Sequence, residues 1–220
     1  MKPHVRNHTL GGDKHLSDTL ANLNSKISDA TLGDADDFCE ETFEVSVFIP
    51  VEDFIDGDYA PSALTTISSG VGQDKVRDFA GATQDEDVVI PWTVPRDIDT
   101  TEGIKFRVIG YITAEVDPAV DTQGVVFGLQ GYSLGIGDPL GGAFGVVQVS
   151  TVTDLFARGC VQFDYWTTSD SPVITVTDLT AGERVIFKLY RDQDHASDTY
   201  AQEIGVAGIV LTYSITPEPT

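Results

Sequence analysis

The sequence predicts an all-β fold in which antiparallel strands form two packed sheets. Apolar and polar residues alternate with a period of two in several runs, which is typical of half-buried strands. β-branched and aromatic residues are frequent in these runs. Between residues 38 and 215, roughly eight or nine such runs alternate with segments rich in Gly, Pro, Ser and Asp, and no convincing helix lies among them.

The C-terminal stretch, residues 180–215, contains the clearest pair of strands. In the first strand Val185, Phe187 and Leu189 share one side, and a similar alternation runs from Ile209 to Ile215 in the second. The segment between them, RDQDHASDT, is too polar for a core and too rich in Asp and Ser for a strand. We expect a long hairpin with an acidic loop, whose apolar face needs a second sheet to cover it.

Earlier segments supply the other strands. We expect them at 43–49, 88–94, 104–116, 123–134, 146–152, 161–165 and 173–176. Pro50 ends the first of these and Pro91 interrupts the second. Residues 51–75 are rich in Gly, Ser, Asp and Pro and predict a long excursion, with a helical turn near Ala63 to Ile67.

Strands of this number and spacing close as a two-sheet sandwich, and an antiparallel jelly roll is the commonest solution. We place this domain at residues 38–216, followed by a short tail at 217–220. An immunoglobulin-like sandwich is the alternative. It is less favoured because the domain is nearly twice the usual size and lacks the spacing of Cys, Trp and Cys. The chain has no internal repeat, which argues against a propeller or solenoid.

Residues 1–37 predict an extended, partly helical N-terminal arm. Gly11 and Gly12 interrupt any regular element. After them Ser17 can cap a short helix, in which leucine and isoleucine side chains from Leu16 to Ile27 form one stripe. A helix of about three turns is marginal alone in water. The arm therefore needs a surface to dock on, either its own domain or another subunit.

The net charge excludes some partners. The 220 residues include 35 acids and 13 bases, a formal charge of −22. Such a surface repels nucleic acids and anionic membranes, so we expect neither as a partner. No run of about 18 apolar residues predicts a membrane span, and the N-terminus lacks the apolar segment of a secretory signal. The acidity fits either adaptation to high salt or an ordinary soluble surface.

No catalytic signature occurs in the sequence. A nucleophile elbow, a zinc-protease motif, a phosphate loop and a CxxC pair are all missing. Three histidines, His4, His8 and His15, lie in the arm, and His195 lies in the last loop. His4 and His8 have the spacing of a helical metal pair, but Pro3 and the glycine pair argue against a helix there. We therefore expect no enzyme, no cofactor and no metal site.

Two clusters of acidic residues suggest a calcium site, but we favour the simpler interpretation that they lie in solvated loops. The clusters are Asp53, Asp56 and Asp58, and Asp192, Asp194 and Asp198. Neither has the spacing of an EF-hand loop. Two facing carboxylates could support glycoside hydrolysis. We rank a β-sandwich hydrolase last, since only 9% of residues are aromatic and no sugar-stacking groove is evident.

Tryptophan and cysteine are scarce. We expect Trp92 and Trp166 in the core or an interface rather than as ligand platforms. Cys39 and Cys160 are too few for a disulfide scaffold, and we expect two unpaired buried thiols unless the fold brings them together.

The arm carries the first of two family resemblances. Residues 8–32, HTLGGDKHLSDTLANLNSKISDATL, resemble a linker in structural proteins of tailed viruses. In that linker an H-x-LGG-x-x-H element precedes LANLNxKxSDATL. The residues that we expect to carry attachment are His8, Leu10, Gly11, Gly12, His15, Leu16, Leu20, Leu23 and Ile27.

The β domain carries the second resemblance. Four stretches are similar in order to a jelly-roll domain of such virion proteins: VPRD, IKFRVIGYITAE, GVVFGLQGYSLGIGDPL and residues 181–215. Its last two strands typically read V-x-F-x-x-x-RD and G-V-x-L-x-Y, joined by D-x-x-DT. Matching positions here are Arg191, Asp192, Asp198, Thr199, Val206, Leu211 and Tyr213, with a slightly different closing spacing. Tyr111 replaces a tryptophan often seen in the first long strand.

The resemblance implies a virion structural protein of the capsid-decoration, turret or head-fibre type, assembled in the host cytoplasm. The arm would attach it to other virion proteins, such as major capsid or neck and tail proteins, and the jelly roll would be exposed and trimeric. The alternative is a tail-fibre or tail-associated module that binds a host receptor or surface glycan. For that function we expect the loops at 51–75 and 134–145 to hold the binding site.

Overall fold

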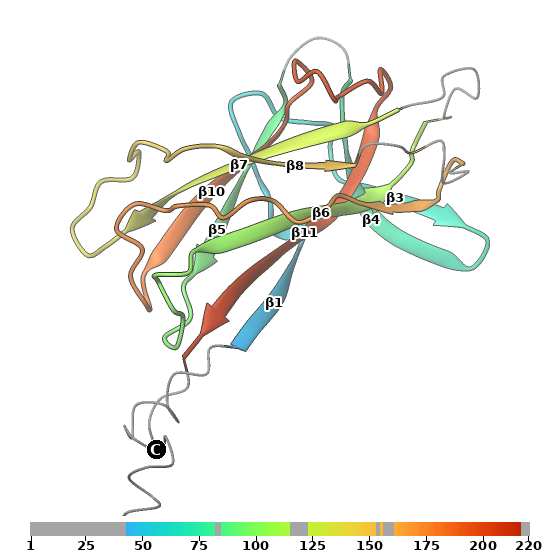
Figure 1. The fold of residues 1–220 in the computed structure, drawn as a ribbon. Coiled ribbons are helices and arrows are strands. Elements are labelled where there is room, and N and C mark those ends of the chain that lie inside the picture. The colour runs from blue at the N-terminus through green and yellow to red at the C-terminus, as the bar shows by residue number, and fades with distance from the viewer. Residues whose placement is uncertain (1–42, 82–84, 115–122, 153–154, 156–160, 217–220) are drawn as a thin grey trace, which may run out of the picture. The chain divides into compact units, whose positions relative to one another are not determined.

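The computed structural model describes residues 43–81, 85–114, 123–152, 155 and 161–216, and residues 42–216 form one compact unit (Figure 1). This described part contains strands and a single 3-10 turn, η2 (Val51–Asp53), but no α-helix. The strands are β1 (Phe43–Pro50), β2 (Ile55–Asp56), β3 (Thr65–Ser69), β4 (Gly72–Phe79), β5 (Asp87–Thr93), β6 (Ile104–Tyr111), β7 (Val125–Leu134), β8 (Gln148–Val152), β9 (Tyr165–Thr167), β10 (Arg184–Arg191) and β11 (Ile204–Ile215). The all-β prediction is confirmed.

The strands form two antiparallel sheets. The first, called sheet A here, has the order β3-β4-β11-β6-β9, and β1 also pairs with β11. The second, sheet B, has the order β2-β5-β10-β7-β8. From β4 onward the chain passes repeatedly from one sheet to the other, so most neighbours within a sheet are distant in sequence. Two packed antiparallel sheets are what the alternating sequence pattern predicts.

The predicted C-terminal hairpin is wrong. β10 pairs with β5 and β7 in sheet B, whereas β11 pairs with β1, β4 and β6 in sheet A. The connection between them crosses from one layer to the other. Both strands are central and largely buried. The period-two pattern identifies a strand and its inward face, but it does not identify the strand's partner.

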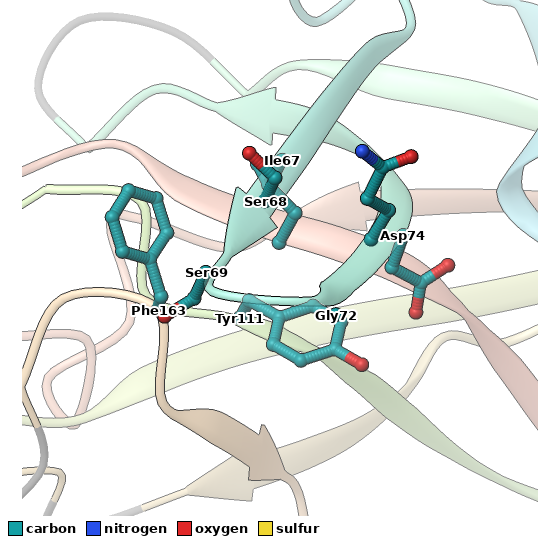
Figure 2. Close-up of a pocket in the computed structure, with 8 residues that line it drawn as sticks. Ile67, Ser68, Ser69, Gly72, Asp74, Tyr111 and Phe163 are labelled. Atoms are coloured by element: carbon teal, nitrogen blue, oxygen red, sulfur yellow. The ribbon is translucent and has the colours of Figure 1, made fainter.

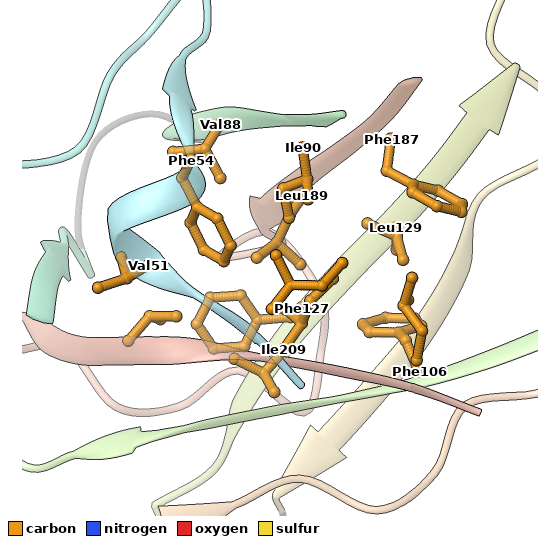
Figure 3. Packing of buried hydrophobic residues seen from close by; sticks show 14 of the residues in the cluster. Val51, Phe54, Val88, Ile90, Phe106, Phe127, Leu129, Phe187, Leu189 and Ile209 are labelled. Carbon is orange, nitrogen blue, oxygen red and sulfur yellow. The ribbon is translucent and has the colours of Figure 1, made fainter. Parts of the chain in front are cut away.

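The core lies between the two sheets (Figure 3). Aromatic side chains from opposite sheets meet there. Phe79 of β4 meets Phe127 of β7 edge to face at 5.6 Å, and Phe127 stacks on Trp166 of β9 at 5.8 Å. Trp92 of β5 lies 5.5 Å from the Tyr213 ring of β11. Both tryptophans belong to the core, as predicted.

Several finer predictions differ from the structure. The excursion at 51–75 contains η2, β2, β3 and the start of β4, with a strand where a helical turn was expected. The segment 173–176 forms only an isolated bridge, between Ile174 and Ile104. Pro91 lies inside β5 and pairs with Ile186 on one side. β2 covers β5 only at Val88 and Val89, so Pro91 occupies an open edge, where its missing N–H costs nothing.

Some predictions lie outside the described residues. They concern the whole arm, residues 1–37, with its expected attachment residues and histidines, and both cysteines, Cys39 and Cys160. The tail at 217–220 belongs to the same group. Among the residues that are described, no helix has the length and apolarity needed to cross a membrane.

Candidate ligand-binding site

Among the residues that the structure describes, two hollows of the sandwich differ in their chemistry. The smaller, called the aromatic hollow here, measures about 160 Å³ and lies where the β3–β4 hairpin approaches the end of β6 (Figure 2). Its lining residues are Ile67, Ser68, Ser69, Gly72, Gln73, Asp74, Tyr111 and Phe163. Drug-sized pockets measure roughly 300–1,000 Å³. The aromatic hollow therefore suits a single small ring rather than an extended ligand.

The β3–β4 hairpin forms one wall of the aromatic hollow. Ser69 pairs with Gly72, so only Gly70 and Val71 form the turn. Gly70 has φ +62°, the left-handed conformation that a type II′ hairpin turn requires at its first central position. The exposed side chains of Ser68, Ser69 and Gln73 make no hydrogen bond to another described residue. Their hydroxyl and amide groups are open to a ligand.

Phe163 forms the opposite wall from a strained position. Its φ of +72° is uncommon for a residue with a side chain, and it lies in a tight loop just before β9. The loop is held by two hydrogen bonds to the end of β6: the Phe163 N–H donates to the Ile112 carbonyl at 2.7 Å, and the Ile112 N–H donates to the Asp164 carbonyl at 3.0 Å. The Gln162 amide adds a third, to the Thr113 carbonyl at 2.7 Å. These bonds hold the Phe163 ring 37% exposed at the hollow.

Tyr111 and Tyr165 extend the aromatic surface. The two rings meet edge to face at 6.0 Å, and Tyr165 is 55% exposed. The Tyr111 hydroxyl lies on the side of Asp74 (Figure 2). Burial, and then the hydrogen bond and the negative charge of Asp74, raise the pKa of Tyr111 above its ordinary value of 10.0. The phenol therefore remains a neutral donor across the physiological range.

The second hollow, called the apolar hollow here, is larger, about 470 Å³, and lies on the outer face of sheet B. Its lining residues are Ile55, Val89, Pro91, Tyr132, Leu134, Leu140, Gly141, Phe144, Arg184 and Ile186. Phe144 meets Tyr132 edge to face at 5.0 Å, and the Tyr132 hydroxyl accepts the Gly141 N–H at 3.3 Å. One of its few polar groups is thus already engaged within the chain.

The loop after β10, predicted to be solvated, contains a buried ion pair. The Arg191 guanidinium donates to both carboxylate oxygens of Asp198 at 3.0 and 2.8 Å, and the side chains are 1% and 2% exposed. Arg191 also donates to the carbonyls of Phe79, Tyr200 and Gln202. This group, called the clasp here, joins the end of β10 in sheet B to the end of β4 in sheet A. For Asp198, the prediction of a solvated position is wrong.

The same loop is fixed to β7. The Asp198 carboxylate accepts the Val126 N–H at 3.0 Å, and the Thr199 hydroxyl accepts the Gly124 N–H at 2.9 Å. The RD and DT dipeptides that match the virion-protein pattern are therefore structural elements of this loop. Arg191 keeps a paired carboxylate because an unpaired buried charge would be costly.

The described acids do not converge on a metal site. No group of three or more His, Cys, Asp or Glu side chains within the described ranges could hold a metal ion. Asp56 pairs with Arg77, and the backbone N–H of Asp58 donates to Asp87 at 3.2 Å. His195 accepts the Ser197 N–H at 3.1 Å within its own loop.

Both loops that we expected to hold a binding site line a hollow. Residues 51–75 include the hairpin turn and Asp74 of the aromatic hollow, and 134–145 include Leu140 and Phe144 of the apolar hollow. The sequence predicts Tyr111 and Phe163 only as strand residues and gives neither a part in binding. Their contribution arises because the hairpin, the end of β6 and the loop before β9 meet in space. The turn sequence SGVG was the one local signal for the hairpin.

Three carbohydrate-binding modules are among the solved structures to which this chain is similar. A carbohydrate-binding module studied for specific mannan recognition aligns with a TM-score of 0.39 and 9% identity, covering 78% of this chain and 98% of the module. A family 11 carbohydrate-binding module from Clostridium thermocellum gives 0.34 and 12%, with coverages of 78% and 88%. A carbohydrate-binding module specific for non-crystalline cellulose gives 0.36 and 9%, with coverages of 77% and 89%.

No protein-family model and no curated protein sequence matches the chain. Because every TM-score above is below 0.5, what this chain binds has to follow from its own residues.

Proposed function

We propose that the β-sandwich binds carbohydrate through the aromatic hollow, as the exposed module of a structural protein of a tailed virus. The observation that carries the proposal is the combination of aromatic walls with open hydroxyl and amide groups and a carboxylate in one small hollow. A pyranose ring has a C–H face that packs on aromatic rings and a rim of hydroxyls that needs hydrogen-bond partners. Both kinds of contact are available there, and the binding requires no chemical reaction.

The fold supports the same role. Eight of the described strands follow the orders β1-β11-β6-β9 in one sheet and β5-β10-β7-β8 in the other, which we interpret as a jelly roll. Such a scaffold holds loops and hairpins at fixed positions, so a site built on them needs little reordering when a ligand binds. The hydrogen bonds at the Phe163 loop are an example of this preorganisation. We propose a binding protein rather than an enzyme.

Ligand-observed NMR with methyl glycopyranosides tests carbohydrate binding. For the full chain we expect saturation transfer to the sugar and millimolar affinity, and Phe163→Ala should weaken binding about three- to tenfold, because one aromatic contact contributes about 0.5–1.5 kcal/mol. Phe144→Ala is the matched control, since it removes an aromatic ring from the other hollow. Equal binding by wild type and Phe163→Ala, or equal losses in both variants, would contradict the assignment of the site.

A second function, attachment to the particle, is favoured by the composition of the first 32 residues. They contain four of the 13 bases and three of the 35 acids, a net charge of +1 in a chain of −22. This segment also carries the H-x-LGG-x-x-H and SDATL elements that resemble virion linkers. We propose that it docks on a neighbouring virion protein. Deletion of residues 1–37 should abolish incorporation into particles, and unchanged incorporation would overturn this proposal.

A further inference from the structure

The charge of the aromatic hollow selects among sugars. We infer that it accepts uncharged or amino-bearing monosaccharide units and rejects those that carry a carboxylate or a sulfate. This inference rests on the proposed carbohydrate binding and adds the chemical class of the ligand.

The lining of the hollow contains one ionisable acid and no base. Asp74 contributes a carboxylate, and none of the lining residues is Lys, Arg or His. Sites that recognise carboxylates or sulfates in proteins normally present Arg or Lys to them. An anionic sugar in this hollow would lose part of its hydration without gaining an opposite charge. It would also approach Asp74, so repulsion would add to the desolvation cost.

The nearest cation in sequence does not compensate for Asp74. Lys75 follows it directly on β4, and successive side chains of a strand point to opposite faces. The Lys75 ammonium donates to the Thr66 hydroxyl, and its backbone N–H donates to the Asp74 carboxylate at 2.8 Å. The carboxylate therefore lines the hollow while it accepts hydrogen bonds from the Lys75 backbone and the Tyr111 hydroxyl. It can accept hydrogen bonds from sugar hydroxyls or from an ammonium group.

Two sources of repulsion can be separated by salt. The overall charge of −22 acts at long range, and it is screened beyond about 8 Å at 0.15 M salt and about 3 Å at 1 M. Repulsion by Asp74 acts within contact distance and persists at high salt. If the hollow itself selects the ligand, the preference for neutral sugars should survive at 1 M salt.

The experiment compares glucose derivatives that carry different charges. Methyl β-D-glucopyranoside, methyl β-D-glucuronide and glucosamine are titrated against the full chain by ligand-observed NMR, at 0.15 and 1 M NaCl. We expect the glucoside and glucosamine to bind about three- to tenfold more tightly than the glucuronide at both salt concentrations. Asp74→Asn should bring glucoside and glucuronide to within about twofold, since the amide keeps the acceptor for Lys75 but removes the charge.

Glu52→Gln is the matched control. It changes the net charge by the same amount at an exposed position that does not line the hollow, so the preference should remain. The inference is overturned if the glucuronide binds wild type as tightly as the glucoside, or if Asp74→Asn leaves the ratio unchanged. A chain that binds none of the three sugars overturns carbohydrate binding itself, which distinguishes failure of the proposed function from failure of this selectivity.

Discussion

The two hollows are built on the same sandwich but offer opposite chemistry. In the aromatic hollow, ring faces stand beside hydroxyl, amide and carboxylate groups that make few hydrogen bonds within the chain. In the apolar hollow, aliphatic side chains dominate, and the Tyr132 hydroxyl already accepts the Gly141 N–H. Directional recognition of a small polar ligand requires unpaired donors and acceptors at fixed positions. The smaller hollow is therefore the better ligand site, although the other has about three times its volume.

The difference shows that size alone is a poor guide to function on this molecule. Apolar area removed from water gives a large but non-directional free energy, whereas open polar groups distinguish one ligand from another. The four predictions below test whether the hollows are independent and what holds each in place, from the largest expected effect to the smallest.

The largest effect should come from the clasp, because it joins the strands on which the two hollows depend. Arg191→Met leaves the Asp198 carboxylate buried without its partner, so we expect a loss of about 3–5 kcal/mol in the free energy of unfolding. Urea unfolding followed by tryptophan fluorescence measures this loss. A change below about 1 kcal/mol would show that the clasp does not hold together the strands on which both hollows are built.

Two controls isolate the buried charge. Asp198→Asn added to Arg191→Met removes the charge but keeps an acceptor for the Val126 N–H, so part of the stability should return. Lys105→Met breaks the Lys105–Glu44 pair, which is 3.1 Å long with side chains 41% and 65% exposed. This loss should stay below about 1 kcal/mol, because solvent screens exposed pairs.

The clasp also shows where sequence reasoning succeeded and where it failed. The alternation of apolar and polar residues predicted most strands and their inward faces, because burial of one face of a strand imposes a period of two. It did not identify partners, so β10 and β11 were joined as a hairpin although they lie in different sheets. Asp198 could not be told from its solvated neighbours, because only the fold brings its carboxylate to Arg191.

The binding site was predictable only in part. The Gly70–Val71 turn is a local signal, since a glycine at φ +62° followed by one residue suits a two-residue hairpin. Tyr111 and Phe163 are 52 positions apart and join one hollow through hydrogen bonds between loop and strand. No local sequence pattern predicts a contact between residues so far apart. The sequence therefore predicts the loops as binding regions but not Tyr111 and Phe163, which face the hairpin across the hollow.

The second prediction tests the independence of the hollows. A neutral apolar dye such as Nile red should bind the apolar hollow, and Leu140→Asp should weaken this binding about tenfold. A charge on the rim replaces an apolar contact worth roughly 1.4 kcal/mol. Dye fluorescence measures the loss. The same variant should leave glycoside binding unchanged, and a parallel loss of both ligands would show that the hollows are coupled.

The third prediction concerns strain in the aromatic hollow. At φ +72°, a side chain at position 163 costs roughly 1 kcal/mol that glycine avoids. Phe163→Gly should therefore unfold at a higher urea concentration than Phe163→Ala, and its free energy of unfolding should be about 1 kcal/mol larger. Both variants lack the ring and should bind sugar equally weakly. If Phe163→Ala is the more stable of the two, the left-handed conformation is not a source of strain at this position.

The smallest effect lies outside both hollows, at acids beside the clasp. Burial first, and then the charges of Asp192 and Asp194, raise the pKa of Asp85 above 3.8, and burial is also the main reason for the raised pKa of Asp192. Their protonated forms are favoured in the folded state. The stability that they contribute is complete below pH 3.8 and is lost as the pH rises through the raised values, so it is missing at pH 7.

Acidification from pH 7 toward pH 3.8 should therefore favour the folded state through these two acids and raise the urea midpoint. Asp85→Asn should gain about 0.5 kcal/mol or less at pH 7 and flatten this slope, because solvent screens a partly exposed group. Asp99 is the opposite control: hydrogen bonds from Thr101 lower its pKa, so its contribution is present above pH 3.8 and is lost on further acidification. Asp99→Asn should lower stability at pH 7. If Asp85→Asn leaves the dependence of the urea midpoint on pH unchanged, these partly buried acids do not limit stability at neutral pH.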